Sequence, residues 1–164
     1  MKENHTARYI TMGAAIAAIY VVLTMLFAPI SFRSLQVRIA EALTILPMFT
    51  SAAIPGLFIG CLLANLLGGA VVLDVVFGSI ATLIGAVGGW LLRKNRWLVP
   101  IPAIAANTVI VPLVLKYGYG VDLPLLLSGL YILMGEVLGC YVLGEVLCTA
   151  FLKREQIFKG RRGA

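Results

Sequence analysis

The sequence contains few charged residues and a single histidine. Asp, Glu, Lys and Arg together make up 12% of its 164 residues, about half of the roughly 25% that is usual in soluble domains. Apolar residues make up 61%, and a soluble domain of this length could not hide that much apolar surface, because enough side chains must face water. Lipid removes that requirement, so we expect an all-α integral membrane protein.

The common motifs of catalysis are also missing. The sequence has no GxxxxGK[ST] pattern for ATP, no GxSxG and no HExxH, and His5 lies in a polar leader ahead of the first apolar run. The three cysteines are odd in number, form no CxxC pair and lie within apolar runs, so we interpret them as small buried hydrophobic residues. We therefore expect no enzyme activity, no cofactor and no resident metal, and we favour a binding function.

Six apolar segments predict a single membrane domain over residues 1–164, built as a bundle of six transmembrane helices. A spanning helix needs about 20 mostly apolar residues, so six of them leave room for short loops alone. The expected spans are approximately 9–28, 39–53, 55–73, 74–92, 97–115 and 124–151. The second span is short, contains Pro47 and is not separated from the third by any charge. A re-entrant pair is therefore the alternative to two complete spans here.

The distribution of basic residues predicts the orientation. A net charge of +6 could suit nucleic acid, but no interleaving of basic and aromatic residues indicates such a partner. Lys and Arg instead gather on the cytoplasmic side of membrane proteins. With six spans and both termini in the cytoplasm, three of the 13 Lys and Arg lie outside, at 33, 38 and 116. Ten lie inside, at 2, 8, 93, 94, 96, 153, 154, 159, 161 and 162.

Small residues at four-residue spacing predict close helix packing. Lipid provides no hydrophobic drive between helices, so residues that let backbones approach matter more than in water. The third segment carries Gly56, Gly60, Ala64 and Gly68 at this spacing. The first segment holds an AxxxA pair, Ala14 and Ala18, whose pattern is too common to indicate a function by itself.

Several polar side chains fall at membrane depth, where they are costly and usually face protein or a water-filled cavity. They are Glu41, Asn65, Asp74, Asn107, Glu136 and Glu145. Glu136 lies roughly 16 Å below the outer end of its segment at helical rise, near mid-bilayer, and either binds a ligand or makes a structural hydrogen bond. Glu145 falls on the opposite helix face near the cytoplasmic end, where we expect contact with a partner or with the basic tail.

The remaining polar residues leave two interpretations open. Arg38 and Glu41 would share a helix face and either pair with each other or present both charges to a ligand at the outer mouth. Asp74 either caps the following helix or faces the ligand. Asn65 and Asn107 lie in runs that glycine or proline could break, and broken helices line binding sites in transporters.

Three stretches resemble the QueT family. Residues 31–43, SFRSLQVRIAEAL, resemble its first loop and second helix, and residues 60–69, GCLLANLLGG, and 73–79, LDVVFGS, resemble later parts. The RxxEAL and LDxxFGS patterns are fairly specific, and the resemblance covers nearly the whole chain. It implies the substrate-binding S component of an energy-coupling factor (ECF) transporter in a bacterial plasma membrane, with the six-helix fold of S components. Partners would be a membrane coupling subunit, met through Ala14 and Ala18, and two ATPase subunits.

The resemblance also implies a ligand, a queuosine precursor such as preQ1 or queuine, bound from outside under a lid made by the first loop. The adjacent N–H donors of its guanine edge suit a carboxylate, and the aminomethyl cation of preQ1 favours a second one. The expected ligand residues are Glu41, Asp74, Glu136, Asn65, Asn107, Arg38 and, for stacking on the ring, Phe32 or Phe77. There are two alternatives. One is an S component for another vitamin-like substrate, and the other is a membrane scaffold protein whose acids hold its helices together.

Overall fold

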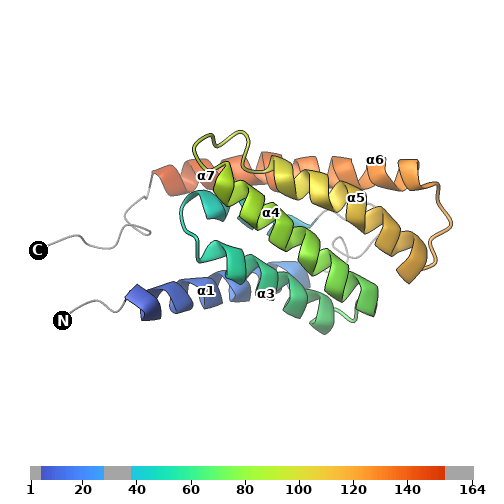
Figure 1. Cartoon of the computed structure of the whole chain (residues 1–164), viewed down its shortest axis with the longest axis horizontal. Helices are drawn as coiled ribbons and strands as arrows, with labels where there is room; N and C mark the ends of the chain where they lie inside the picture. Colours follow the sequence, from blue (N-terminus) through green and yellow to red (C-terminus); the bar gives the residue numbers. More distant parts are fainter. Residues whose placement is uncertain (1–4, 28–37, 154–164) are drawn as a thin grey trace, which may run out of the picture.

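The chain folds into a bundle of helices that run up and down along one long axis (Figure 1). A computed structural model describes residues 5–27 and 38–153, and within these ranges it contains helices and no strand. The helices are α1 (His5–Leu26), η1 (Ile39–Met48), α3 (Ala53–Leu67), η2 (Asp74–Gly78), α4 (Ser79–Leu91), α5 (Ile101–Gly118), α6 (Leu125–Glu136), η3 (Val137–Leu143) and α7 (Gly144–Leu152). η1 is a 3₁₀-helix, whereas η2 and η3 are π-helical.

Four helices are long and apolar enough to cross a membrane: His5–Leu26, Asp74–Leu91, Ile101–Gly118 and Leu125–Leu152. The last of these is α6, η3 and α7 joined end to end. η1 and α3 are apolar but shorter, and each extends about 20 Å at its helical rise, less than the roughly 30 Å of a hydrocarbon core. The all-helical fold is thus confirmed, with four helices that could span a membrane, while six complete spans are not confirmed.

The short elements have local causes. η1 contains Pro47, which has no N–H to donate to a regular helix. The third expected span, 55–73, ends early because α3 stops at Leu67 and Gly69 then takes a φ of 70°, a conformation that favours glycine at a helix end. The fifth expected span, 97–115, is shifted because α5 begins after Pro100 and carries a proline in its first turn, a position where proline suits a helix.

α1 begins and α7 ends at the same end of the bundle, which we call the terminal end (Figure 1). The turn between α4 and α5 lies there as well, because Arg96 Nε is 3.6 Å from Glu145 Oε2 of α7. Glu145 therefore contacts the basic turn that carries Arg93 and Lys94. The opposite end, where α3, α5 and the loop before α6 meet, is called the far end.

Glycine brings α1 and α3 into direct backbone contact, as the four-residue spacing predicts. A Cβ on Gly56 would lie 2.8 Å from the Gly13 carbonyl oxygen, and a Cβ on Gly60 would lie 2.8 Å from Tyr20 Cβ and 3.1 Å from Ala17 Cα. These distances leave no room for a methyl group. The packing fixes the position of Tyr20, which is fully buried.

We predict that Gly60→Ala lowers the stability of the protein by about 1–3 kcal/mol, because the added methyl group forces α1 and α3 apart. Thermal unfolding in detergent measures the change. Gly129→Ala is the matched control, since its Cβ would meet nothing closer than 3.7 Å and alanine is the better helix former by about 1 kcal/mol. Equal melting temperatures for the two variants would contradict the close contact of α1 with α3.

Candidate functional site

A buried polar network lies where η1, α3, η2 and the α6–η3 junction meet. Its members come from separate elements of the bundle but are almost completely shielded from solvent. Exposed fractions are 6% for Arg38, 1% for Glu41, 0% for Asn65, 1% for Asp74, 4% for Asn107 and 5% for Glu136. The structure therefore brings together six of the residues expected to bind a ligand.

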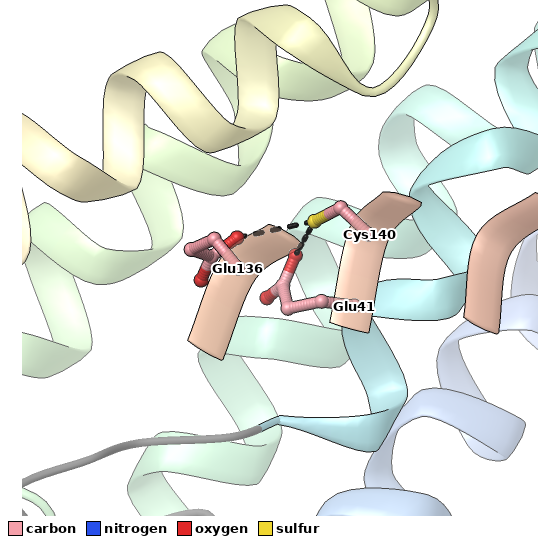
Figure 2. Close-up of side chains that lie close together, drawn as sticks. All are labelled: Glu41, Glu136 and Cys140. Atoms are coloured by element: carbon pink, nitrogen blue, oxygen red, sulfur yellow. Dashed lines mark hydrogen bonds between the residues drawn. The ribbon is translucent and has the colours of Figure 1, made fainter. Parts of the chain in front are cut away.

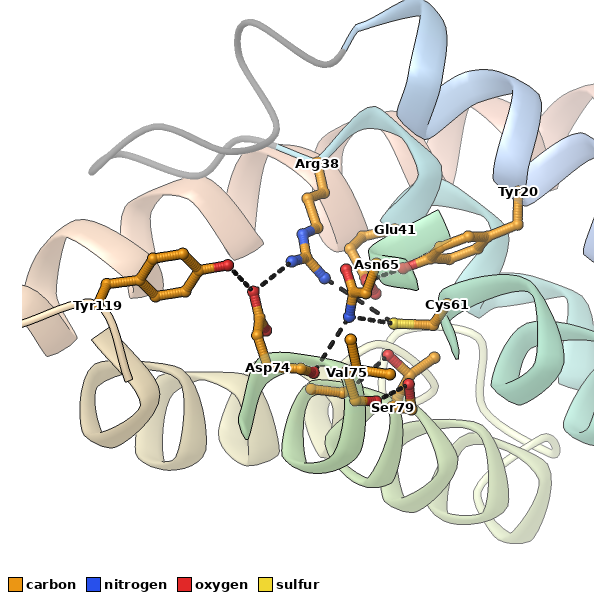
Figure 3. Close-up of polar contacts among 11 residues, drawn as sticks. Tyr20, Arg38, Glu41, Cys61, Asn65, Asp74, Val75, Ser79 and Tyr119 are labelled. Carbon is orange, nitrogen blue, oxygen red and sulfur yellow. Dashed lines mark hydrogen bonds and ion pairs between the residues drawn. The ribbon is translucent and has the colours of Figure 1, made fainter. Parts of the chain in front are cut away.

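One half of the network is built around Asp74, at the start of η2. Its Oδ2 lies 3.6 Å from Arg38 Nη2 and accepts a hydrogen bond from the Tyr119 hydroxyl at 2.9 Å (Figure 3). The carboxylate thus holds η1, η2 and the residue after α5 together. Partial burial and the neighbouring Asp74 carboxylate raise the pKa of Tyr119 to about 12, so this hydroxyl remains a neutral donor at physiological pH.

Asn65 extends this half of the network towards α3. Its Nδ2 donates to the Asp74 backbone oxygen at 3.2 Å and approaches Cys61 Sγ at 3.6 Å, and Arg38 Nη1 approaches the same sulfur at 3.9 Å. These contacts leave two buried acceptors, Asn65 Oδ1 and Asp74 Oδ1, without a hydrogen-bond partner among residues 5–27 and 38–153. Buried acceptors are nearly always hydrogen-bonded, so both oxygens are available to a donor that is not part of the described chain.

The other half of the network contains two carboxyl groups and a thiol. Glu41 Oε1 accepts a hydrogen bond of 2.5 Å from the Tyr20 hydroxyl. The Cys140 thiol lies 3.1 Å from Glu136 Oε2 and 4.0 Å from Glu41 Oε2, so that it sits between the two carboxyl groups (Figure 2). The Asn107 side chain is a further hydrogen-bond partner of Glu136.

This arrangement depends on the α6–η3 junction. Glu136 ends α6, and the π-helical turn of η3 follows at once; such wide turns are frequent at functional sites. Gly139 lets the junction approach η1, because a Cβ there would lie 2.9 Å from the Arg38 backbone oxygen and 3.5 Å from Glu41 Cβ. Glu136 and Cys140 therefore both reach Glu41.

The spacing of these groups suits a cation. The ligand-type atoms of Glu41, Glu136 and Cys140 lie within 4.8 Å of one another, and all three residues are buried. Carboxylate and thiolate groups bind transition metals, and two carboxyl groups at this distance can also accept hydrogen bonds from one ammonium group.

Of the two residues expected to stack on a ligand ring, Phe77 does not belong to the network. Phe32 lies outside the described residues. Phe77 is 45% exposed and lines an apolar groove of about 530 Å³ with Leu73, Ile80 and Tyr117, on the outside of the bundle. The cause is the geometry of η2, which turns Asp74 and Gly78 inwards and leaves Phe77 facing outwards. The expectation of stacking by Phe77 is corrected accordingly.

Ala14 and Ala18 lie on the outer face of α1, away from this network. Both are exposed, and they line an apolar groove of about 650 Å³ between α1 and α3, which we call the α1–α3 groove. Its floor consists of small residues, among them Gly13, Ala17 and Gly56. The groove can accept a helix of another protein at close backbone distance.

The sequence did not reveal four members of the network: Tyr20, Cys61, Tyr119 and Cys140. The cysteines are buried and free, as predicted, but their interpretation as purely hydrophobic residues is wrong for Cys61 and Cys140, which contact charged and amide groups. Tyr20 is one of few polar side chains within an apolar helix, and this was the available signal. Tyr119 follows the end of α5, where nothing in the sequence indicates that Asp74 lies nearby.

Comparison with known proteins identifies relatives of the chain. Residues 10–153 match the model of the family described as QueT transporter. The protein named queuosine precursor transporter QueT from Lactococcus lactis subsp. cremoris (strain MG1363) is 36% identical over 86 residues, which cover 51% of this chain and 50% of that protein. The match thus spans about half the length of this curated relative. No solved structure matches the chain.

We predict that Tyr20→Phe lowers the stability of the ligand-free protein by about 1–3 kcal/mol, because it removes the hydroxyl donor and leaves Glu41 Oε1 buried without it. Thermal unfolding in detergent measures the loss. Tyr117→Phe is the control, since Tyr117 is 71% exposed, and its effect should be within 0.5 kcal/mol or so. In a Glu41→Leu background Tyr20→Phe should cost much less; the same cost in both backgrounds would contradict the hydrogen bond.

Proposed function

Because the chain belongs to the QueT transporter family, we propose that it is the substrate-binding S component of an ECF-type importer and captures a queuosine precursor. The ligand is a 7-deazaguanine, preQ1 or queuine, which is bound from outside the cell. The relative from Lactococcus lactis is named a queuosine precursor transporter, which supports this ligand class.

The buried polar network is the observation that carries the proposal. Its acids and amides, Glu41, Asp74, Glu136, Asn65 and Asn107, lie in the interior of an apolar bundle, where unpaired polar groups are expensive. A flat heterocycle with several N–H donors and a cationic arm matches these acceptors. Binding of such a ligand would satisfy groups that the described chain leaves open.

The orientation in the membrane supports capture from outside. The basic turn that carries Arg93, Lys94 and Arg96 lies at the terminal end of the bundle, where Arg96 contacts the start of α7, and basic segments stay in the cytoplasm. The terminal end is then cytoplasmic and the far end is external. Arg38, Asp74 and Tyr119 form the part of the network nearest the outside.

Energy for transport would come from other subunits. The sequence carries no ATP-binding motif of the Walker type, so ATP hydrolysis is assigned to two ATPase subunits and contact with them to a membrane coupling subunit. The α1–α3 groove, with Ala14 and Ala18 exposed along it, is the surface we assign to the coupling subunit. The loaded protein would topple in the membrane to release its ligand inwards.

We predict that the purified protein binds preQ1 saturably and is stabilised by it. A ligand that binds the native state at 100 times its dissociation constant adds about 2.7 kcal/mol of stability, which raises the melting temperature measurably. Isothermal titration and thermal unfolding test this, with riboflavin, biotin and thiamin as controls.

The alternatives give distinct results in the same assays. Stabilisation by a B vitamin but not by preQ1 or queuine would assign the protein to another substrate. If no small molecule stabilises the protein, a structural role is favoured, in which the buried acids hold the helices together by hydrogen bonds.

We also predict that Ala14→Leu together with Ala18→Leu abolishes uptake in cells but leaves preQ1 binding by the purified protein unchanged. The larger side chains fill the α1–α3 groove and keep the coupling helix at a distance. Uptake of labelled precursor and co-purification of the coupling subunit measure the effect.

Ala15→Leu provides the matched control, because Ala15 is also exposed on α1 but lines a different groove, with Leu43 and Phe151. Its uptake should equal that of the native protein. Normal uptake by the Ala14 and Ala18 variant, or equal loss in the Ala15 variant, would exclude the α1–α3 groove as the coupling surface.

A further inference from the structure

We infer that the polar network recognises its ligand through two separate subsites with different chemistry. The first is called the donor subsite because it binds the N–H donors of the ligand. It consists of the acceptors Asn65 and Asp74 and binds a heterocycle edge that carries two adjacent N–H donors. The ammonium subsite consists of Glu41, Glu136 and Cys140 and binds the cationic arm. The inference rests on the proposed function for the ligand class and assigns an orientation to the ligand within the site.

The donor subsite follows from the contacts that fix its two side chains. The Asn65 amide nitrogen is committed to the Asp74 backbone oxygen and to Cys61 Sγ. Asp74 Oδ2 is committed to Tyr119 and Arg38. The second oxygen of each side chain, Asn65 Oδ1 and Asp74 Oδ1, is buried with no hydrogen-bond partner in the described part of the chain.

The Asn65 side-chain oxygen is a hydrogen-bond acceptor and never a donor, and the same holds for the oxygens of an ionised carboxylate such as that of Asp74. Gly78 packs closely against both side chains, since a Cβ there would lie 2.7 Å from Asp74 Oδ1 and 3.2 Å from Asn65 Nδ2, so a larger residue would displace them. In Figure 3 the Asn65 side-chain oxygen points towards Arg38 and Glu41, on the opposite side from the amide nitrogen that donates to Asp74. We infer that these two acceptors receive the N–H donors of the ligand, such as the ring N–H and the exocyclic amino group of a guanine.

The ammonium subsite follows from charge. The hydrogen bonds described for Glu41 and Glu136 come from a tyrosine hydroxyl, a thiol and an amide. The positive charge of Arg38 also acts on both carboxyl groups, but Arg38 is ion-paired with Asp74 as well, so three acids share its single charge. One guanidinium does not balance three carboxylates, and buried charges require a charged partner. An ammonium group has three donors, which matches two carboxyl groups whose oxygens lie within 4.8 Å of each other and of the thiol sulfur.

Arg38 decides which end of the ligand occupies which subsite. Its guanidinium is ion-paired with Asp74 at 3.6 Å, so the donor subsite already contains a cation. A second cation would be repelled there and attracted to Glu41 and Glu136. The ligand is thus oriented with its neutral edge towards Asn65 and Asp74 and its ammonium towards the α6–η3 junction.

The test crosses two variants with two ligands. The ligands are preQ1 and 7-methyl-7-deazaguanine, which has the same heterocycle edge but no cation. Glu136→Gln should lower the affinity for preQ1 by about 10-fold to 100-fold, the range for a charged hydrogen bond, and change the affinity for the methyl compound less than threefold. Asn65→Leu should lower both affinities by the same factor, about tenfold. Titration calorimetry measures all four combinations, and thermal unfolding without ligand verifies that each variant is folded.

A comparison in the native protein needs no variant. 7-Aminomethyl-7-deazahypoxanthine keeps the cation but lacks the exocyclic amino group, and it should bind about tenfold more weakly than preQ1. The methyl compound should also bind at least tenfold more weakly than preQ1. Equal affinity of the native protein for these compounds and preQ1 would overturn the assignment even if a variant failed to fold.

The outcomes separate the inference from the proposed function. Binding of preQ1 by the native protein, with Glu136→Gln weakening both ligands equally, overturns the two subsites but not the transport of a precursor. Loss of preQ1 affinity alone in Asn65→Leu indicates the reverse orientation and also overturns the assignment. A native protein that binds none of these compounds contradicts the proposed ligand and the subsites together.

Discussion

The ion pair between Arg38 and Asp74 determines how the middle of the protein is built. It joins the start of η1 to the start of η2 at 3.6 Å, in an interior where a charge left without a partner would be very costly. Tyr119 and Asn65 then attach the end of α5 and the body of α3 to the same aspartate. Asp74 therefore connects four elements, through its carboxylate to Arg38 and Tyr119 and through its backbone oxygen to Asn65, and the bundle cannot rearrange there without exposing a buried charge.

The helix α1 contacts both surfaces to which we assign a function. On its inner side Tyr20 donates to Glu41 in the buried polar network, and on its outer side Ala14 and Ala18 line the α1–α3 groove. The close contact with Gly60 fixes Tyr20 against α3. A side chain of the proposed ligand site and the proposed coupling surface thus belong to the same helix, so α1 connects the two directly.

Composition and charge predicted a protein surrounded by lipid, an all-helical fold and most members of the buried polar network. The network could be predicted because polar residues in an apolar sequence are few and each must face protein. They did not predict how helices end or which face a residue presents. Phe77 was expected to stack on the flat ring of the ligand, but the π-helical turn of η2 leaves it on the outside of the bundle. Cys140 joins Glu41 across the bundle through the close approach at Gly139, and a contact between residues so far apart in sequence leaves no local pattern to detect. The length of η1 could not be predicted, because Pro47 does not determine at which of the neighbouring residues the helix ends.

The shortness of η1 is consistent with its position in the bundle. Its residues from Ala40 to Pro47 are all buried, so protein and not lipid surrounds them. Lipid does not tolerate backbone groups without internal hydrogen bonds, whereas irregular backbone is tolerated where protein surrounds it. In η1 the Thr44 hydroxyl donates to the Glu41 backbone oxygen at 2.6 Å, so a side chain satisfies an acceptor that the 3₁₀ geometry serves less well. An element that need not face lipid is free to place a carboxylate in the interior of the bundle, and η1 places Glu41 there.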